Sequence, residues 1–152
     1  MKRIPRILQA VTIVLGLAVA GCSDDDPAGP NGGGAPPDLS GTYDLASFTS
    51  VLTGGLTLTP PIVSGTFTLT QTNVAGDEAT GSLTVSITVP DGTGGTQTIN
   101  DGGTFKVRGD GTWEQTGNAV QGTGTFTLVG STLTVNVTSP ATAVSTSVWQ
   151  RQ

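Results

Sequence analysis

The side chains that most often carry enzyme chemistry are scarce in this chain of 152 residues, which contains no histidine and one cysteine, Cys22. Without histidine, neither a Ser-His-Asp nor a Cys-His relay can form, and no Cys/His zinc site can be assembled. Among the carboxylates, Asp44 and Glu114 stand in strand-like stretches next to Tyr43 and Trp113. Alternation along a strand predicts that both point away from the core. We therefore predict a protein that is not an enzyme and that uses no metal or cofactor.

The segment that precedes Cys22 has the pattern of an export signal. Three basic residues among the first six precede an apolar stretch over residues 7–20, which is the pattern of a secretory signal. The stretch is too short to span a bilayer comfortably, since spanning requires about 20 apolar residues.

The sequence Val19-Ala20-Gly21-Cys22 resembles the lipobox of bacterial lipoproteins. The resemblance implies that residues 1–21 are a signal peptide, that Cys22 receives a diacylglyceryl group, and that its freed amine gains a third acyl chain. Two or more chains anchor a protein stably, whereas one chain is marginal. The alternative is ordinary cleavage after Ala20, which would release a soluble protein beginning at Gly21.

Residues 22–38 are expected to form an unstructured tether behind the acylated cysteine. The segment is rich in Asp, Gly and Pro and has no apolar periodicity, so it cannot bury a core. A flexible coil of this length has a mean reach of roughly 20–25 Å. Ser23 and the acidic run after it resemble the export signal of some Gram-negative surface lipoproteins. This resemblance implies an exported protein at the outer membrane, facing either the periplasm or the cell surface.

The distribution of charge argues against nucleic acid as a partner. Three basic residues follow Cys22, against eleven acidic ones, so this part has a net charge near −8. Such a surface repels phosphate backbones. It also lacks the basic cluster that would hold anionic lipid headgroups. Attachment to the membrane is therefore expected to come from the acyl chains on Cys22.

Residues 39–152 are expected to form one all-β domain, because apolar residues alternate with polar ones instead of recurring at helical spacing. The clearest stretches are 82–89 and 132–137, where Leu, Val or Ile occupies every second position. Each stretch thus has one apolar face and one face of β-branched or small polar residues, which suits a pleat with one solvated side.

Recurring glycines divide this domain into short segments. A Gly-Thr-aromatic motif occurs at Gly41, Gly65, Gly103, Gly111 and Gly124, and we interpret each glycine as a turn before a new strand. Asp-Gly pairs at 91–92, 101–102 and 110–111, together with Gly-Asn at 117–118, predict tight hairpin turns. The expected strands cover residues 41–50, 55–59, 63–72, 80–89, 96–99, 103–108, 111–116, 121–129, 131–138 and 143–150.

About eight to ten short strands joined by short turns predict an antiparallel meander. A meander can close into a barrel or stack as a β-sandwich. A closed barrel leaves no exposed edge in strands this rich in Thr and Val, so the pattern favours a small closed barrel. The β-sandwich is the alternative.

Three segments resemble the small bacterial lipocalin-like domains: Leu39 to Leu45, the Gly109–Trp113 hairpin and Val148 to Arg151. In lipocalins the first strand opens with Gly-x-Trp, and a basic residue near the last strand packs on that Trp. Here Tyr43 replaces the Trp. The resemblance implies that Arg151 is its basic partner, in a cation–π contact that closes the barrel.

The interior of an eight-stranded barrel is either filled by its own side chains or holds one small ligand. Phe67, Phe105, Trp113 and Phe126 are expected to point inward, and their number favours a filled core over a ligand pocket. The sequence is compatible with two alternative functions. The lipoprotein binds a small apolar ligand or an envelope protein, or it is a structural or adhesive surface module with a solid β-core and no small-molecule ligand.

Replacing Cys22 by alanine tests the lipid anchor. We expect the wild type, grown with a fatty-acid analogue, to become labelled and the Cys22→Ala variant to stay unlabelled, because the cysteine is the acceptor of the acyl chains. Gel detection of the label gives the answer, and protease treatment of whole cells reports which side the domain faces. Equal labelling of both proteins would contradict the anchor.

Overall fold

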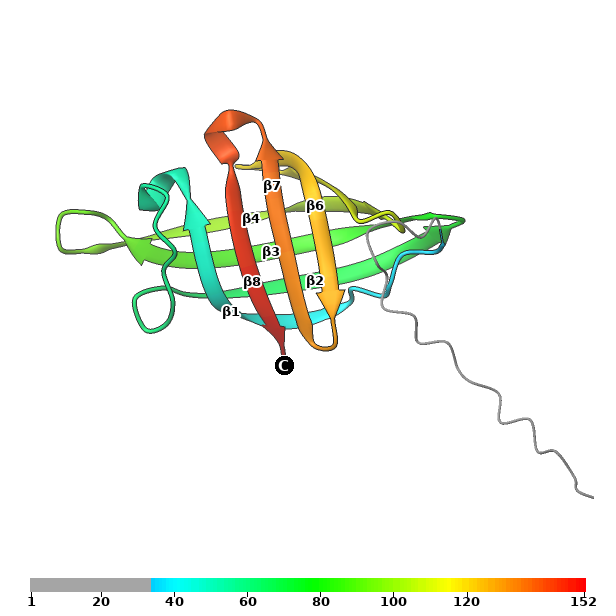
Figure 1. Cartoon of the computed structure of the whole chain (residues 1–152), viewed down its shortest axis with the longest axis horizontal. Helices are drawn as coiled ribbons and strands as arrows, with labels where there is room; N and C mark the ends of the chain where they lie inside the picture. Colours follow the sequence, from blue (N-terminus) through cyan, green and yellow to red (C-terminus); the bar gives the residue numbers. More distant parts are fainter. Residues whose placement is uncertain (1–33) are drawn as a thin grey trace, which may run out of the picture.

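The computed structural model describes residues 34–152, which form a closed barrel of eight antiparallel strands (Figure 1). The predicted signal peptide, the lipobox and residues 22–33 of the predicted tether lie outside the described residues. The closed barrel is confirmed, and the β-sandwich alternative is wrong. The strands are β1 (Gly41–Ser50), β2 (Ser64–Ala75), β3 (Glu78–Pro90), β4 (Thr96–Arg108), β5 (Thr112–Gly117), β6 (Gln121–Val129), β7 (Thr132–Ser139) and β8 (Ser145–Arg151).

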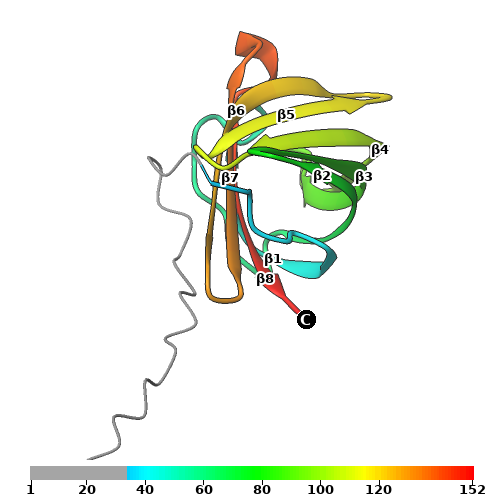
Figure 2. The ribbon, with the colours of Figure 1, turned by 90° about the vertical axis from the view of Figure 1, so that its right-hand side faces the viewer.

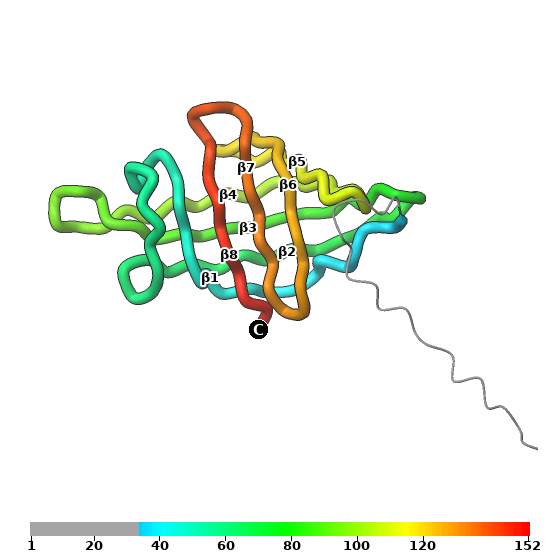
Figure 3. Tube along the Cα trace, in the orientation of Figure 1, coloured from blue at the N-terminus to red at the C-terminus, as the bar shows by residue number. Residues whose placement is uncertain are grey.

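Each strand pairs with its neighbours in chain order, and the pairing of β1 with β8 closes the barrel. In Figure 1, β1, β8, β7 and β6 run steeply across the front, while β2, β3 and β4 cross behind them in a clearly different direction. The view in Figure 2 shows the strands surrounding a common interior. The trace in Figure 3 shows that the long hairpins β2–β3 and β3–β4 project from opposite ends of the barrel.

The meander order gives the barrel two different ends. One end holds the start of β1 and the last residues of β8, so the first described residues and the C-terminus lie there. The other end holds two 3₁₀ turns, η1 (Val51–Thr53) and η2 (Ala141–Ala143), which meet where Val51 N–H donates to the carbonyl of Val144 at 3.4 Å. No helix within residues 34–152 is long and apolar enough to cross a membrane.

The predicted alternation is confirmed by the core. Leu83, Ile87 and Val89 on β3 are buried, and the residues between them are not. Strand β7 shows the same pattern. The buried apolar side chains form one cluster in the barrel interior: Leu39, Tyr43, Leu45, Phe48, Val63, Phe67, Leu69, Ala79, Leu83, Ile87, Val89, Phe105, Val107, Trp113, Phe126, Leu133, Val135, Val137 and Trp149.

Two of the predicted Asp-Gly turns lie where expected. Gly92 and Gly111 have φ values of 77° and 88°, in the left-handed region that favours glycine. The preceding carboxylates cap these turns: Asp91 Oδ1 accepts the N–H of Thr93 at 2.8 Å, and Asp110 Oδ1 accepts the N–H of Thr112 at 2.9 Å. These hydrogen bonds to Thr93 and Thr112 lower the pKa of both carboxyl groups.

Two predicted features are wrong. Residues 55–59 do not form a strand, because only Leu58 bridges to Phe48 while the surrounding loop passes over the barrel end. Residues 96–99 and 103–108 belong to the single strand β4, so the turn expected at Asp101-Gly102 does not exist. The turn predicted at Gly117-Asn118 does exist between β5 and β6. Asp101 points inward and accepts hydrogen bonds from the backbone of this turn, a contact that the local sequence does not predict.

The glycines of the Gly-Thr-aromatic motif do not all mark turns before strands, contrary to the prediction. Only Gly41 and Gly111 precede or begin strands; Gly65, Gly103 and Gly124 lie within β2, β4 and β6. At Gly103 an added Cβ would lie 2.0 Å from the carbonyl oxygen of Thr116, and at Gly124 it would lie 1.9 Å from that of Asn136. These glycines therefore permit a close approach between neighbouring strands.

The adjacent residues Gly102 and Gly103 give a matched test of this constraint. Gly103→Ala should lower the free energy of unfolding by about 1–3 kcal/mol or more, because its Cβ collides with backbone. Gly102→Ala should be neutral or slightly stabilising, since its Cβ would meet nothing closer than 3.7 Å. Denaturant unfolding of both variants measures the difference. Equal stabilities would contradict the close approach.

Candidate functional site: a cavity at one end of the barrel

The barrel interior contains a cavity of about 460 Å³ at the end that carries η1 and η2. Its walls are mainly apolar and come from strands on all sides, with Phe48, Phe67, Val85, Val137 and Trp149 among them. The turn between β5 and β6 and the segment from Pro140 to Ser145 border it at the barrel end. The size suits one small ligand.

The other half of the interior is filled by aromatic rings. Phe105 and Trp113 are stacked with their centroids 5.5 Å apart, and Phe67 and Phe126 contact Trp113 at centroid distances of 6.2 Å and 6.4 Å. All four side chains are buried. Of the four predicted inward aromatics, Phe67 borders the cavity, whereas Phe105, Trp113 and Phe126 belong to the filled half.

Two aromatic residues of the cavity were not identified from the sequence. Phe48 points inward because a β-bulge between Leu45 and Ser47 shifts the alternation along β1, and the sequence shows no clear signal for this shift. Trp149 is paired with Leu45 and Leu133 and lies 5.0 Å from Phe67 between ring centroids. Its Nε1 is buried and has no hydrogen-bond partner among residues 34–152.

The cavity wall also holds polar groups. Asp101 is 8% exposed, and its carboxylate accepts three backbone N–H groups, each at 2.9 Å, from Gly102, Ala119 and Val120. These amides replace water around the carboxylate. Gln115, on β5, accepts the indole N–H of Trp113 through its Oε1 at 2.9 Å. Ser147 lies in the same wall on β8.

The opposite end of the barrel is closed by the predicted pair, Tyr43 and Arg151. The structure brings them together across the β1–β8 seam, with the Arg151 Cζ 5.2 Å from the centre of the Tyr43 ring. The Tyr43 hydroxyl donates to the Leu39 carbonyl at 2.8 Å and accepts from Arg151 Nη2 at 2.7 Å. Arg151 Nη2 also donates to the Asp38 carbonyl at 2.9 Å. The arginine thus fastens residues 38–39 over this end.

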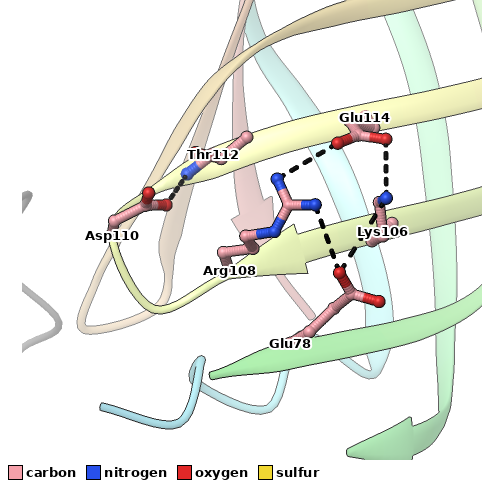
Figure 4. A network of polar contacts seen from close by, with 6 residues as sticks. All are labelled: Glu78, Lys106, Arg108, Asp110, Thr112 and Glu114. Atoms are coloured by element: carbon pink, nitrogen blue, oxygen red, sulfur yellow. Dashed lines mark hydrogen bonds and ion pairs between the residues drawn. The ribbon is translucent and has the colours of Figure 1, made fainter. Parts of the chain in front are cut away.

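The two remaining basic side chains of the described chain lie on the outer face of the sheet (Figure 4). Lys106 Nζ is 2.9 Å from Glu114 Oε2 and 3.8 Å from Glu78 Oε2. Arg108 contacts the same two carboxylates, each at 3.2 Å. Hydrogen bonding to Lys106, aided by both positive charges, lowers the pKa of Glu114. The four residues form a network that links β3, β4 and β5.

The two carboxylates singled out in the sequence lie apart from the cavity. Asp44 is exposed on β1, where its Oδ1 accepts from Gln152 Nε2 at 2.8 Å, and Glu114 belongs to the outer network. Residues 34–152 contain no group of three or more Cys, Asp or Glu side chains placed to bind a metal ion. The apolar cavity is therefore the best-defined candidate site.

Comparison with known proteins found no matching family, no matching curated protein and no matching solved structure.

The outer network gives a prediction on pH dependence. The pKa of Glu114 is lowered by folding, so its contribution to stability is present above 4.5, the ordinary glutamate value, and is lost as the pH falls through the lower folded value. Glu114→Gln should therefore destabilise the barrel at pH 7 by less than about 1 kcal/mol, because the pairs are partly exposed. Thermal unfolding at pH 7 and at about pH 3 should show this difference vanish in acid.

Asp44→Asn is the control, because it removes the same charge from a residue that contacts no cation in the described chain. It should change the stability less than Glu114→Gln does at pH 7. An effect of Glu114→Gln that is as large in acid as at neutral pH would contradict the ion-pair origin.

Proposed function

We propose that this protein is an exported lipoprotein, held at the outer membrane by acyl chains on Cys22, whose lipocalin-like barrel binds one small apolar ligand without catalysing a reaction. The observation that carries the proposal is the apolar cavity of about 460 Å³. Cavities of this size with a few polar groups in an apolar wall are typical ligand sites. A barrel with no binding role would be expected to fill this space, as it does around Trp113.

The position of the cavity relative to the tether supports this proposal. The tether would join the domain at the end closed by Arg151, since Leu39 precedes β1 there. The cavity lies at the other end, beside η1 and η2. A domain anchored in this way would expose its cavity on the side away from the tether, where a ligand or a partner can reach it.

A contact surface for an envelope protein is a second candidate, because the loop beside the cavity has exposed apolar side chains. Val51, Leu52, Leu56 and Ile62 have exposed fractions of 52%, 59%, 67% and 56%. Exposed apolar patches on soluble domains often mark contact sites. This function depends on the loop surface and not on empty space inside the barrel, so filling the cavity separates the two candidates.

Val85→Trp tests ligand binding, because Val85 lines the cavity from β3 and a larger side chain would occupy it. We expect the whole chain, made with Cys22→Ala so that detergent is unnecessary, to bind the neutral dye Nile red. Val85→Trp should weaken this binding by at least about tenfold. Fluorescence titration measures the affinity, and native mass spectrometry shows whether a ligand is retained from the cell.

Val129→Trp is the matched control. Val129 is 68% exposed at the end of β6, opposite the cavity, so the same substitution there should leave dye binding unchanged. Circular dichroism establishes that both variants fold. Equal dye binding by Val85→Trp and the wild type, or no uptake of apolar molecules by the wild type, would contradict a ligand carrier and leave the contact surface as the better candidate.

A further inference from the structure

The cavity wall carries charge of one sign only. Among the described residues that line it, Asp101 is the single charged side chain. It lies on β4 between Ile99 and Gly103 and points into the barrel, as its exposure of 8% reflects. The neutral polar groups of the wall, Gln115 among them, supply hydrogen bonds but cannot offset a charge.

No cation of the described chain reaches this carboxylate. Lys106 and Arg108 bind Glu78 and Glu114 on the outer face, and Arg151 is held by Tyr43 at the closed end. The negative charge in the cavity wall is therefore offset only by backbone amide dipoles.

The hydrogen bonds of Asp101 leave room for one more donor. Oδ1 accepts from Gly102 and Ala119, while Oδ2 accepts from Val120 alone. An ionised carboxylate offers about four acceptor sites, so about one remains, on Oδ2. Gly117 accommodates this oxygen, since a Cβ at Gly117 would collide with it. The carboxylate thus fixes the β5–β6 turn and, because Asp101 lines the cavity, leaves about one acceptor site in the cavity wall.

We infer that the cavity selects apolar molecules whose polar end donates a hydrogen bond, a protonated amine above a hydroxyl, and that it rejects molecules ending in a carboxylate. This inference rests on the proposed ligand binding. An ammonium group would pair with Asp101 away from bulk water, where attraction between charges is strongest. A second carboxylate would be desolvated beside a like charge without a cation nearby.

Three probes with the same alkyl chain separate head-group charge from apolar burial: decylamine, decanol and decanoate. We expect calorimetric titration of the whole chain, carrying Cys22→Ala, to show decylamine binding at least about tenfold tighter than decanoate at neutral pH, with decanol between them. Val85→Trp should abolish binding of all three, which assigns the signal to the cavity rather than to the acidic surface.

Two variants test whether Asp101 sets the preference. Asp101→Asn should reduce the amine-to-carboxylate ratio to within about threefold, whereas Asp44→Asn, with the same change in net charge, should preserve it. Asp101→Asn also weakens the cap of the β5–β6 turn, so a second variant keeps the native carboxylate. Asn118→Lys places a cation at the cavity rim and should also reduce the amine-to-carboxylate ratio. Asn100→Lys, on the exposed outer face of β4, is its control.

Each outcome decides a separate point. If decanoate bound the wild type as tightly as decylamine does, the charge preference would be overturned. The proposed ligand site would still be supported if decanol bound the wild type and did not bind Val85→Trp. A preference that persists in both Asp101→Asn and Asn118→Lys would overturn the role of Asp101. Failure of all three probes to bind would overturn this inference and the proposed function together.

Discussion

Closure of eight short strands into one small barrel is the constraint on which the other features depend. A wall of this curvature brings neighbouring backbones so close on the inner side that a Cβ does not fit. At Gly81 and Gly103 an added Cβ would lie 2.1 Å and 2.0 Å from a carbonyl oxygen of the next strand. Glycine at these inward positions therefore permits the close approach of neighbouring strands in a closed wall. The β1–β8 seam in turn brings Tyr43 to Arg151, which lie at opposite ends of the domain sequence.

Inward-facing glycines also affect how the interior is filled. Gly81 faces Phe105 across β3 and β4, and Gly124 faces Trp113 across β5 and β6. The Phe105 ring occupies the space that a side chain at Gly81 would take, since an added Cβ there would lie 2.7 Å from its Cε1. Phe105 in turn stacks on Trp113 in this part of the barrel. Such pairs are absent from the part of the wall formed by β7 and β8, where Val137 faces Ser145 and Val135 faces Ser147. These smaller side chains border the cavity instead of filling it.

The sequence predicted those features that depend on local pattern. Alternation identified the strands and their inward faces, Asp-Gly pairs located two of the turns, and the Gly-x-Tyr motif pointed to the pairing with Arg151. The features that depend on residues distant in the sequence could not be predicted from local patterns. Phe48 points inward because of a bulge in the pairing of β1 with β8. Asp101 occupies an inward position that the pattern would give to an apolar residue, and it accepts hydrogen bonds from amides 18 and 19 residues further along the chain. The cavity depends on both, so its lining could not be assigned from the sequence.

Asp101 links the stability of the fold to the chemistry of the cavity. A tight turn at the end of β5 leaves backbone N–H groups that need acceptors, and a carboxylate can satisfy several donors at once where a neutral amide oxygen can accept fewer. An inward cation would offset the charge of Asp101 but would also occupy the cavity and lose its own hydration. The chain instead keeps Lys106 and Arg108 paired outside and Arg151 at the closed end. Because the β5–β6 turn requires a hydrogen-bond acceptor, a carboxylate lies in the cavity wall. Any molecule bound in the cavity would therefore meet a negative charge.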